Sequence, residues 1–296
     1  MFQKAYEIAS QYTAPVVLSR KTISGECNSS IGAYVFLNDK GWIVTAFHIL
    51  KQYEELANGE KQARDIEVQV QAIENDQSLD RRARKKKISK IRKMKKSDTS
   101  RGSAWFGRDK FRIVEWAGLE AVDIAVARLE PFDPAWVSKY PTFKDPTKDF
   151  DPGASLCKLG YPFHQINPTW NDTKDAFELP AGSVPLPLFP IDGILTRIAE
   201  LVATNAPPPP FPMRWIETST PGLRGQSGGP VFDIKGTIWG IQVNTAHYPL
   251  GFDPAVPGAP ASQREHQFLN VGRGVHPDTL FGLFDQLGLS YDTSTY

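Results

Sequence analysis

Short runs rich in valine, isoleucine and aromatic residues recur along the chain, separated by turn residues such as those at 38–41. Five of these runs occupy residues 14–20, 31–38, 41–50, 111–117 and 122–129. A second set occupies residues 154–162, 213–220, 228–246 and 265–275. The pattern predicts many short β-strands, which are typical of barrels or of a sandwich.

Four segments have helical patterns instead. Near the N-terminus, one face of a short amphipathic helix would hold Phe2, Tyr6, Ile8, Ala9 and Tyr12. Residues 61–100 are polar and contain no glycine or proline, which predicts a long exposed helix or a helical hairpin. We expect another helix around Ile194–Val202. A C-terminal helix is indicated by the spacing of Leu280, Phe281, Leu283, Phe284 and Leu287.

A stretch rich in proline and aspartate, residues 131–152, separates the two sets of strands. We therefore expect two packed β-barrels, although periodicity alone does not exclude a sandwich. The expected units are an N-terminal helix at 1–14, a first barrel at 15–130 with a charged helical insertion at 51–105, the linker at 131–152, a second barrel at 153–275 with a proline-rich insertion at 180–213, and a C-terminal helix and tail at 276–296.

The net charge of the 296-residue chain is only +1, but the charges are unevenly distributed. Residues 81–101 hold 12 of the 34 Lys and Arg residues and one of the 33 Asp and Glu residues, so the rest of the chain is acidic. This basic arm contains no aromatic residues and no recognised nucleic-acid-binding module. Three interpretations stay open: a solvated basic helix, an arm that docks a protein, or a nucleic-acid-binding segment.

The cysteines and the N-terminus bear on the compartment. Cys27 and Cys157 are the only cysteines and lie outside any CxxC motif, which argues against a disulfide scaffold and against a zinc site. The sequence has neither a signal-peptide pattern at its start nor a run of about 18 apolar residues. We expect a cytoplasmic protein without a cofactor or metal and without membrane contact.

The stretch Gly225–Pro230, with the sequence GQSGGP, surrounds one serine with glycines. Ser227 could be a nucleophile, with the N–H groups of Gly225 and Ser227 as donors to a developing oxyanion. The alternative is an ordinary glycine-rich hairpin turn. The composition of the stretch alone does not decide between them.

A serine nucleophile needs a base, and His48 is the one histidine of five that ends a strand-like run. Asp123, directly before an apolar run, is the candidate for orienting the imidazole, because an acid at the edge of a core needs a hydrogen-bond donor. Taken singly, His48 could be an ordinary core or surface residue, and Asp123 a surface residue at the start of a strand.

Together these residues resemble the trypsin/chymotrypsin superfamily of serine proteases. Residues 45–48 resemble its T-A-x-H motif, residues 123–129 its D-I-A-x-x-x-L motif, and residues 225–230 its G-x-S-G-G-P motif. Residues 29–50 and 236–246 are most similar to the bacterial, disulfide-free branch, which includes heat-shock serine proteases and glutamyl endopeptidases. The resemblance covers roughly residues 15–50, 110–130, 153–163 and 214–276.

The resemblance implies an all-β fold of two packed six-stranded antiparallel barrels with the active site between them. It also implies a serine endopeptidase that cleaves protein substrates through an acyl-enzyme intermediate. In that mechanism His48 is the general base, Asp123 holds its tautomer, and Ser227 attacks. The N–H groups of Gly225 and Ser227 form the oxyanion hole.

Three positions depart from the relatives. Gln226 replaces the aspartate that pairs with a newly cut N-terminus in zymogen-type proteases, Pro221 replaces the aspartate that gives trypsins their preference for Lys and Arg, and Gln242 replaces a histidine of glutamyl endopeptidases. We therefore expect an uncharged P1 residue. The residues expected to line its pocket are Thr220, Pro221, Gly222, Val243, Asn244 and Thr245.

The sequence also predicts control by a partner, because neither a zymogen aspartate nor a propeptide-like segment is present. A regulatory protein would act on the 51–105 insertion or on the 180–213 insertion. Two other functions stay open. One is a binding module on a protease fold without turnover, and the other is a nucleic-acid-binding protein acting through Arg81–Arg101.

Overall fold

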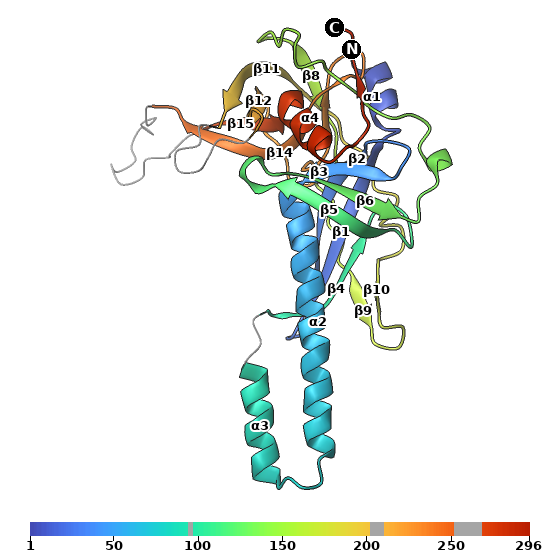
Figure 1. Cartoon of the computed structure of the whole chain (residues 1–296), viewed down its shortest axis with the longest axis vertical. Helices are drawn as coiled ribbons and strands as arrows, with labels where there is room; N and C mark the ends of the chain where they lie inside the picture. The colour runs from blue at the N-terminus through green and yellow to red at the C-terminus, as the bar shows by residue number, and fades with distance from the viewer. Residues whose placement is uncertain (94–96, 202–209, 252–267) are drawn as a thin grey trace, which may run out of the picture.

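The computed structural model describes residues 1–93, 97–201, 210–251 and 268–296 (Figure 1). Residues 94–96 of the basic arm, residues 202–209 of the proline-rich insertion and residues 265–267 of a predicted strand lie outside the described residues. Two large β-sheets form the body, and a long pair of helices extends away from it (Figure 1).

The first sheet has six strands in the order β4-β1-β2-β3-β6-β5, and all neighbours are antiparallel. The strands are β1 (Thr13–Thr22), β2 (Cys27–Phe36), β3 (Trp42–Ala46), β4 (Thr99–Trp105), β5 (Arg112–Leu119) and β6 (Ile124–Glu130). The apolar runs at β3 and β6 are almost completely buried and pair with each other inside the sheet. The sheet forms a half-barrel.

The second sheet contains a closed ring of six strands, because β13 and β14 pair with each other as well as with β8 and β15. The ring consists of β13 (Pro230–Phe232), β8 (Ser155–Lys158), β11 (Ile191–Glu200), β12 (Arg214–Thr218), β15 (Phe268–Val275) and β14 (Ile238–Pro249). Two short strands, β7 (Thr142–Phe143) and β16 (Asp292–Thr293), extend the sheet beside β14. The expected chymotrypsin-like double-barrel fold class is confirmed.

One apolar core joins the two sheets. It includes Val44 and Ile124 of the first sheet, Ile238 and Val275 of the second, and Phe284 of the C-terminal helix α4 (Pro277–Gln286). The N-terminal helix α1 (Gln3–Ala9) is also anchored, because the buried residue Tyr12 just after it donates a hydrogen bond of 3.0 Å to the Gly236 carbonyl. Burial of this shared apolar surface holds the barrels against each other.

A helical arm leaves the body directly after β3. Helix α2 (Phe47–Asn75) is followed by α3 (Arg81–Lys93), which returns beside it as a hairpin (Figure 1). The half of α2 nearest the body packs on β4, where Leu56, Gly59 and Ala63 are buried. Helix α3 has no buried residue.

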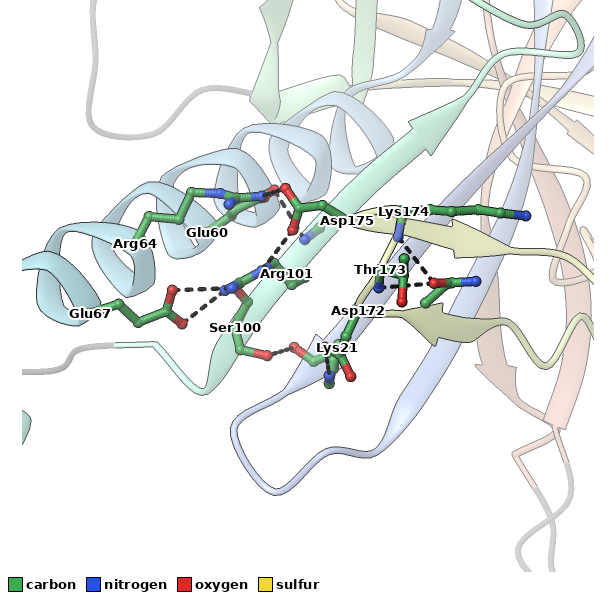
Figure 2. Close-up of polar contacts among 12 residues, drawn as sticks. Lys21, Glu60, Arg64, Glu67, Ser100, Arg101, Asp172, Thr173, Lys174 and Asp175 are labelled. Atoms are coloured by element: carbon green, nitrogen blue, oxygen red, sulfur yellow. Dashed lines mark hydrogen bonds and ion pairs between the residues drawn. The ribbon is translucent and has the colours of Figure 1, made fainter. Parts of the chain in front are cut away.

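Ion pairs brace the body end of this arm, as Figure 2 shows. Arg64 of α2 and Arg101 of β4 both contact the carboxylate of Asp175, at 2.8 and 3.7 Å. Asp175 belongs to the turn between β9 (Thr169–Asn171) and β10 (Ala176–Glu178). Arg101 also pairs with Glu67 at 3.0 Å. The brace therefore ties α2 to a hairpin that follows β8 in the chain.

Three sequence-based expectations differ from the structure. The segment expected to be helical around Ile194–Val202 forms strand β11 as far as Glu200, because it completes the ring between β8 and β12. Closing the ring outweighs the local helical pattern of Leu195–Glu200. The strand-like run at 41–50 ends at Ala46, so His48 lies in the first turn of α2 and not at a strand end. Within the range 51–105, residues 99–105 form β4 of the sheet.

The buried His276 caps α4 and makes the stability of the fold depend on pH. Its Nδ1 accepts a hydrogen bond of 3.1 Å from the Asp278 N–H. Burial, with a smaller effect of Arg214, lowers the pKa of His276 to about 3. The folded protein thus keeps this imidazole neutral, whereas the unfolded chain takes up a proton near pH 6.5.

We expect the contribution of His276 to the free energy of unfolding to be fully present above about pH 6.5. As the pH drops from there towards 3, this contribution should fall by about 1.4 kcal/mol per pH unit. Urea unfolding at pH 7 and pH 5 measures the effect. The His276→Asn variant keeps a capping acceptor and should lose this part of the pH dependence. The exposed His247→Asn variant serves as the control, and equal pH dependence in all three proteins would contradict the prediction.

Candidate active site

His48 follows the end of β3, and Asp123 directly precedes the start of β6, the neighbouring strand of the first sheet. Because Ala46 pairs with Ile124, the first turn of α2 lies beside the residue that precedes β6. The imidazole Nδ1 of His48 is 2.8 Å from Oδ2 and 3.0 Å from Oδ1 of Asp123. The backbone N–H of His48 donates to the same Oδ1 at 2.9 Å. The carboxylate therefore fixes both the backbone and the ring of His48.

The backbone of Asp123 adopts an uncommon conformation that this contact requires. Its φ of +60° lies in the left-handed region, directly after the 3₁₀ turn Glu120–Val122. Aspartate tolerates this region better than most side chains. In addition, the Asp123 carbonyl accepts a hydrogen bond of 3.0 Å from the Phe47 N–H. Both the main chain and the side chain of Asp123 thus hold the start of α2.

The Ser227 loop is held by close backbone contacts that only glycine allows. Gly225 and Gly228 have φ values of +93° and +86°. A Cβ on Gly225 would collide with the Tyr161 carbonyl, and one on Gly228 would collide with the Ala33 carbonyl. The Ser227 carbonyl accepts a hydrogen bond of 2.8 Å from the Ala33 N–H, which connects the loop to β2. Gly228 therefore serves packing between the two barrels, whereas Gly225 allows the loop to pack against the segment that follows β8 in its own barrel.

His48, Gly225 and Ser227 line one open cavity of about 790 Å³. Within the described chain, the backbone N–H groups of Gly225 and Ser227 have no hydrogen-bond acceptor, so both can donate to a ligand. The Ser227 hydroxyl donates to the Val243 carbonyl at 3.3 Å, and no hydrogen bond joins it to His48. The structure thus brings the predicted base and nucleophile to the same cavity without linking them directly.

The residues predicted for the substrate pocket form a neighbouring structure. The Gly222 N–H donates to Thr245 Oγ1 at 2.9 Å, and the Thr245 hydroxyl donates back to the Gly222 carbonyl at 2.8 Å. These two hydrogen bonds hold the segment Thr220–Gly222 against the segment Val243–Thr245. None of the six residues lines the 790 Å³ cavity, although Val243 contacts Ser227.

A buried lysine beneath this segment was not predicted from the sequence. Lys158 of β8 is 1% exposed, and its Nζ donates to the carbonyls of Thr220 at 2.6 Å and Pro221 at 2.9 Å and to Thr218 Oγ1 at 3.2 Å. Burial lowers the pKa of Lys158 to about 8. A lysine inside the apolar run 154–162 was the available signal, but its partners are backbone carbonyls, which leave no trace in a sequence.

Other cavity residues were also missed. Phe163 lines the cavity with 76% of its surface exposed, and its backbone has a φ of +64°. Its ring stands edge-on to Phe189, with ring centroids 5.3 Å apart. Arg224, immediately before Gly225, is exposed at the rim of the same cavity. A bulky residue with positive φ is a conformation that periodicity does not reveal.

In residues 1–93, 97–201, 210–251 and 268–296, no group of three His, Cys, Asp or Glu side chains is arranged to hold a metal ion. In the same ranges, no helix combines the length and the apolar character needed to cross a membrane.

The comparisons with known proteins agree with this geometry. The model of the trypsin-like peptidase domain family matches residues 32–241, which is well over half of the chain. The chain therefore belongs to the trypsin-like peptidase domain family. The comparison with curated proteins gives no match.

Two solved structures illustrate the structural similarity. The active form of the Rv3671c protease from M. tuberculosis shares 12% identity at a TM-score of 0.48, over 99% of this chain and 88% of that one. The HtrA-type protease AlgW with tripeptide shares 13% identity at a TM-score of 0.48, over 97% of this chain and 63% of that one. This chain thus spans less than two thirds of that AlgW chain.

Proposed function

We propose that the protein is a serine endopeptidase that uses His48, Asp123 and Ser227 as its catalytic residues. The observation that carries the proposal is the His48–Asp123 pair facing the cavity that Ser227 also lines. When Nδ1 carries its proton towards Asp123, the other ring nitrogen of His48 is an acceptor. It can take the proton of the Ser227 hydroxyl once that hydroxyl rotates away from Val243.

The reaction would be acyl transfer in two stages. Ser227 Oγ attacks the scissile carbonyl, and the free N–H groups of Gly225 and Ser227 donate to the resulting oxyanion. His48 then protonates the leaving amine, which leaves an acyl-enzyme for water to hydrolyse. The two unpaired donors favour this chemistry because their positions are fixed before substrate arrives.

A second function has one observation in its favour. The Ser227 hydroxyl is bonded to the Val243 carbonyl and not to His48, which suits a binding module that holds peptides without cleaving them. We favour the peptidase because a 3.3 Å hydrogen bond is weak, so the Ser227 hydroxyl can readily exchange the Val243 carbonyl for another acceptor.

Peptide hydrolysis by active-site variants tests the proposal. Ser227→Ala should abolish turnover and leave the melting temperature nearly unchanged, because it removes one half-exposed hydroxyl. Asp123→Asn should lower kcat by about 10⁴-fold, a magnitude taken from the well-studied triad of this superfamily. An unchanged kcat in Ser227→Ala would contradict the mechanism.

For specificity, we propose an uncharged P1 residue held by Thr220–Gly222 and Val243–Thr245. Position 221 is a proline and therefore offers no carboxylate to a basic side chain. The buried amino group of Lys158 lies directly beneath this segment and donates to the carbonyls of Thr220 and Pro221. A Lys or Arg side chain would lose water without gaining an acceptor charge, and would meet a positive charge below pH 8.

A peptide library varied at P1 tests this proposal. We expect kcat/KM for Lys or Arg at P1 to be lower than for the best uncharged residue by roughly 100-fold. A profile in which Lys or Arg dominates would contradict it, whether or not the mechanism holds.

We also propose that a partner regulates the enzyme through the helical arm, in the cytoplasm. Helix α2 carries His48 in its first turn and continues for 29 residues into the arm. The brace at Asp175 connects the same helix to the β9–β10 hairpin, which follows the cavity residue Phe163 in the chain. Both cysteines are free, which suits a reducing compartment.

The Asp175→Ala variant tests the coupling between arm and site. It removes the contacts of the exposed Asp175 to Arg64 and Arg101, so we expect little change in melting temperature. If the brace positions α2, kcat/KM should change by about threefold or more. The exposed Asp149→Ala variant is the control, and identical kinetics in both variants would contradict the coupling.

A further inference from the structure

Helix α3 lies at the far end of the arm (Figure 1). It presents a dense set of cations to solvent. Nine of its 13 residues are basic, none is acidic and none is buried. The nine are Arg81, Arg82, Arg84, Lys85, Lys86, Lys87, Lys90, Arg92 and Lys93. Within the described part of the chain, no ion pair neutralises any of them. Such a concentration of like charge calls for a polyanionic partner.

The cations are arranged around three sides of the helix. Arg84, Ile88 and Ile91 are half-buried and mark the side towards α2. At 100° per residue, the side facing directly away holds Arg82, Lys86 and Lys93. One flank holds Arg81, Lys85 and Arg92, and the opposite flank holds Lys87 and Lys90.

This arrangement matches the major groove of double-stranded DNA. The groove is about 12 Å wide and 8.5 Å deep, and it admits a helix about 10–12 Å across. Phosphates line both of its edges, so the two flanks of α3 would each face a strand of phosphates while the outward row points to the base edges. A flat acidic protein surface would contact the cations on only one of these three sides of α3.

Other polyanions fit less well. An anionic membrane would favour apolar side chains on the outward side, but the two isoleucines of α3 face α2. Single strands are held by aromatic stacking, and α3 has no aromatic residue. In double-stranded RNA the major groove is too narrow for a helix.

The surroundings of α3 leave this surface open. The stretch of α2 beside α3 carries three acids, Asp65, Glu67 and Glu74, and Glu67 is already paired with Arg101 at 3.0 Å. At the tip, the Asp80 carboxylate accepts from the Ala83 N–H at 2.7 Å, and the Asp76 carboxylate accepts from the Ser78 N–H at 2.9 Å. These two acids are therefore engaged in shaping the turn.

We propose that α3 binds double-stranded DNA in the major groove, mainly through phosphates and with little sequence preference. Duplex DNA would then be the partner that acts on the arm. Binding itself depends only on α3, whereas an effect of DNA on hydrolysis rests on the function proposed above.

Fluorescence anisotropy with a labelled 20-bp duplex tests the binding, using the full-length Ser227→Ala protein so that proteolysis plays no part. The test variant replaces Lys85, Lys86, Lys90 and Lys93 with glutamine, which keeps helix propensity. The matched control makes the same change at the exposed residues Lys4, Lys40, Lys139 and Lys148, and therefore alters net charge equally.

We expect the α3 variant to bind roughly 100-fold more weakly at low salt, and the slope of log K against log salt to become shallower by about 3 to 4. The control should bind like the parent. Equal weakening in both variants, or no duplex binding by the parent, would overturn the inference.

Competition distinguishes the alternatives. A polyglutamate peptide, a single strand or vesicles with anionic lipid that displace the duplex at lower charge concentration than unlabelled duplex would also overturn it. Peptide hydrolysis by the wild-type protein with and without duplex is measured separately. Inactive protein that still binds DNA through α3 refutes the proposed peptidase and supports this inference.

Discussion

The contact between Asp123 and His48 connects the first sheet, the helical arm and the candidate site. One carboxylate accepts from the backbone N–H and from the imidazole of His48. It thereby fixes the point at which a buried strand becomes a 29-residue helix. The contact exists because β3 and β6 pair in a register that places Ala46 opposite Ile124. Hydrophobic burial of these two strands thus positions a polar pair at their ends.

The second barrel contributes Ser227 through backbone contacts and not through side-chain recognition. Gly228 packs against the Ala33 carbonyl, and the Ala33 N–H donates to the Ser227 carbonyl. The Ser227 loop is therefore held against β2, which lies two strands away from β6 in the first sheet. Both halves of the candidate site rest on the same shared core, so the site depends on the barrels staying packed.

The sequence predicted the features that local chemistry determines. Alternating apolar runs indicated most strands, and GQSGGP together with the motifs at His48 and Asp123 indicated which residues would meet. Features that depend on partners distant in the chain were not predictable. The segment Ile191–Glu200 is a strand because β8 and β12 lie on either side of it. Lys158 is buried because three carbonyl and hydroxyl oxygens converge on its amino group.

Covalent labelling with a fluorophosphonate probe tests most directly whether Ser227 is an activated nucleophile, as we propose. Only a serine whose hydroxyl loses its proton to a base reacts readily with such a probe. We predict a single adduct on Ser227, located by mass spectrometry, and its loss in a His48→Ala variant. An absence of labelling in folded wild-type protein, or an adduct that persists in His48→Ala at the same rate, would contradict it.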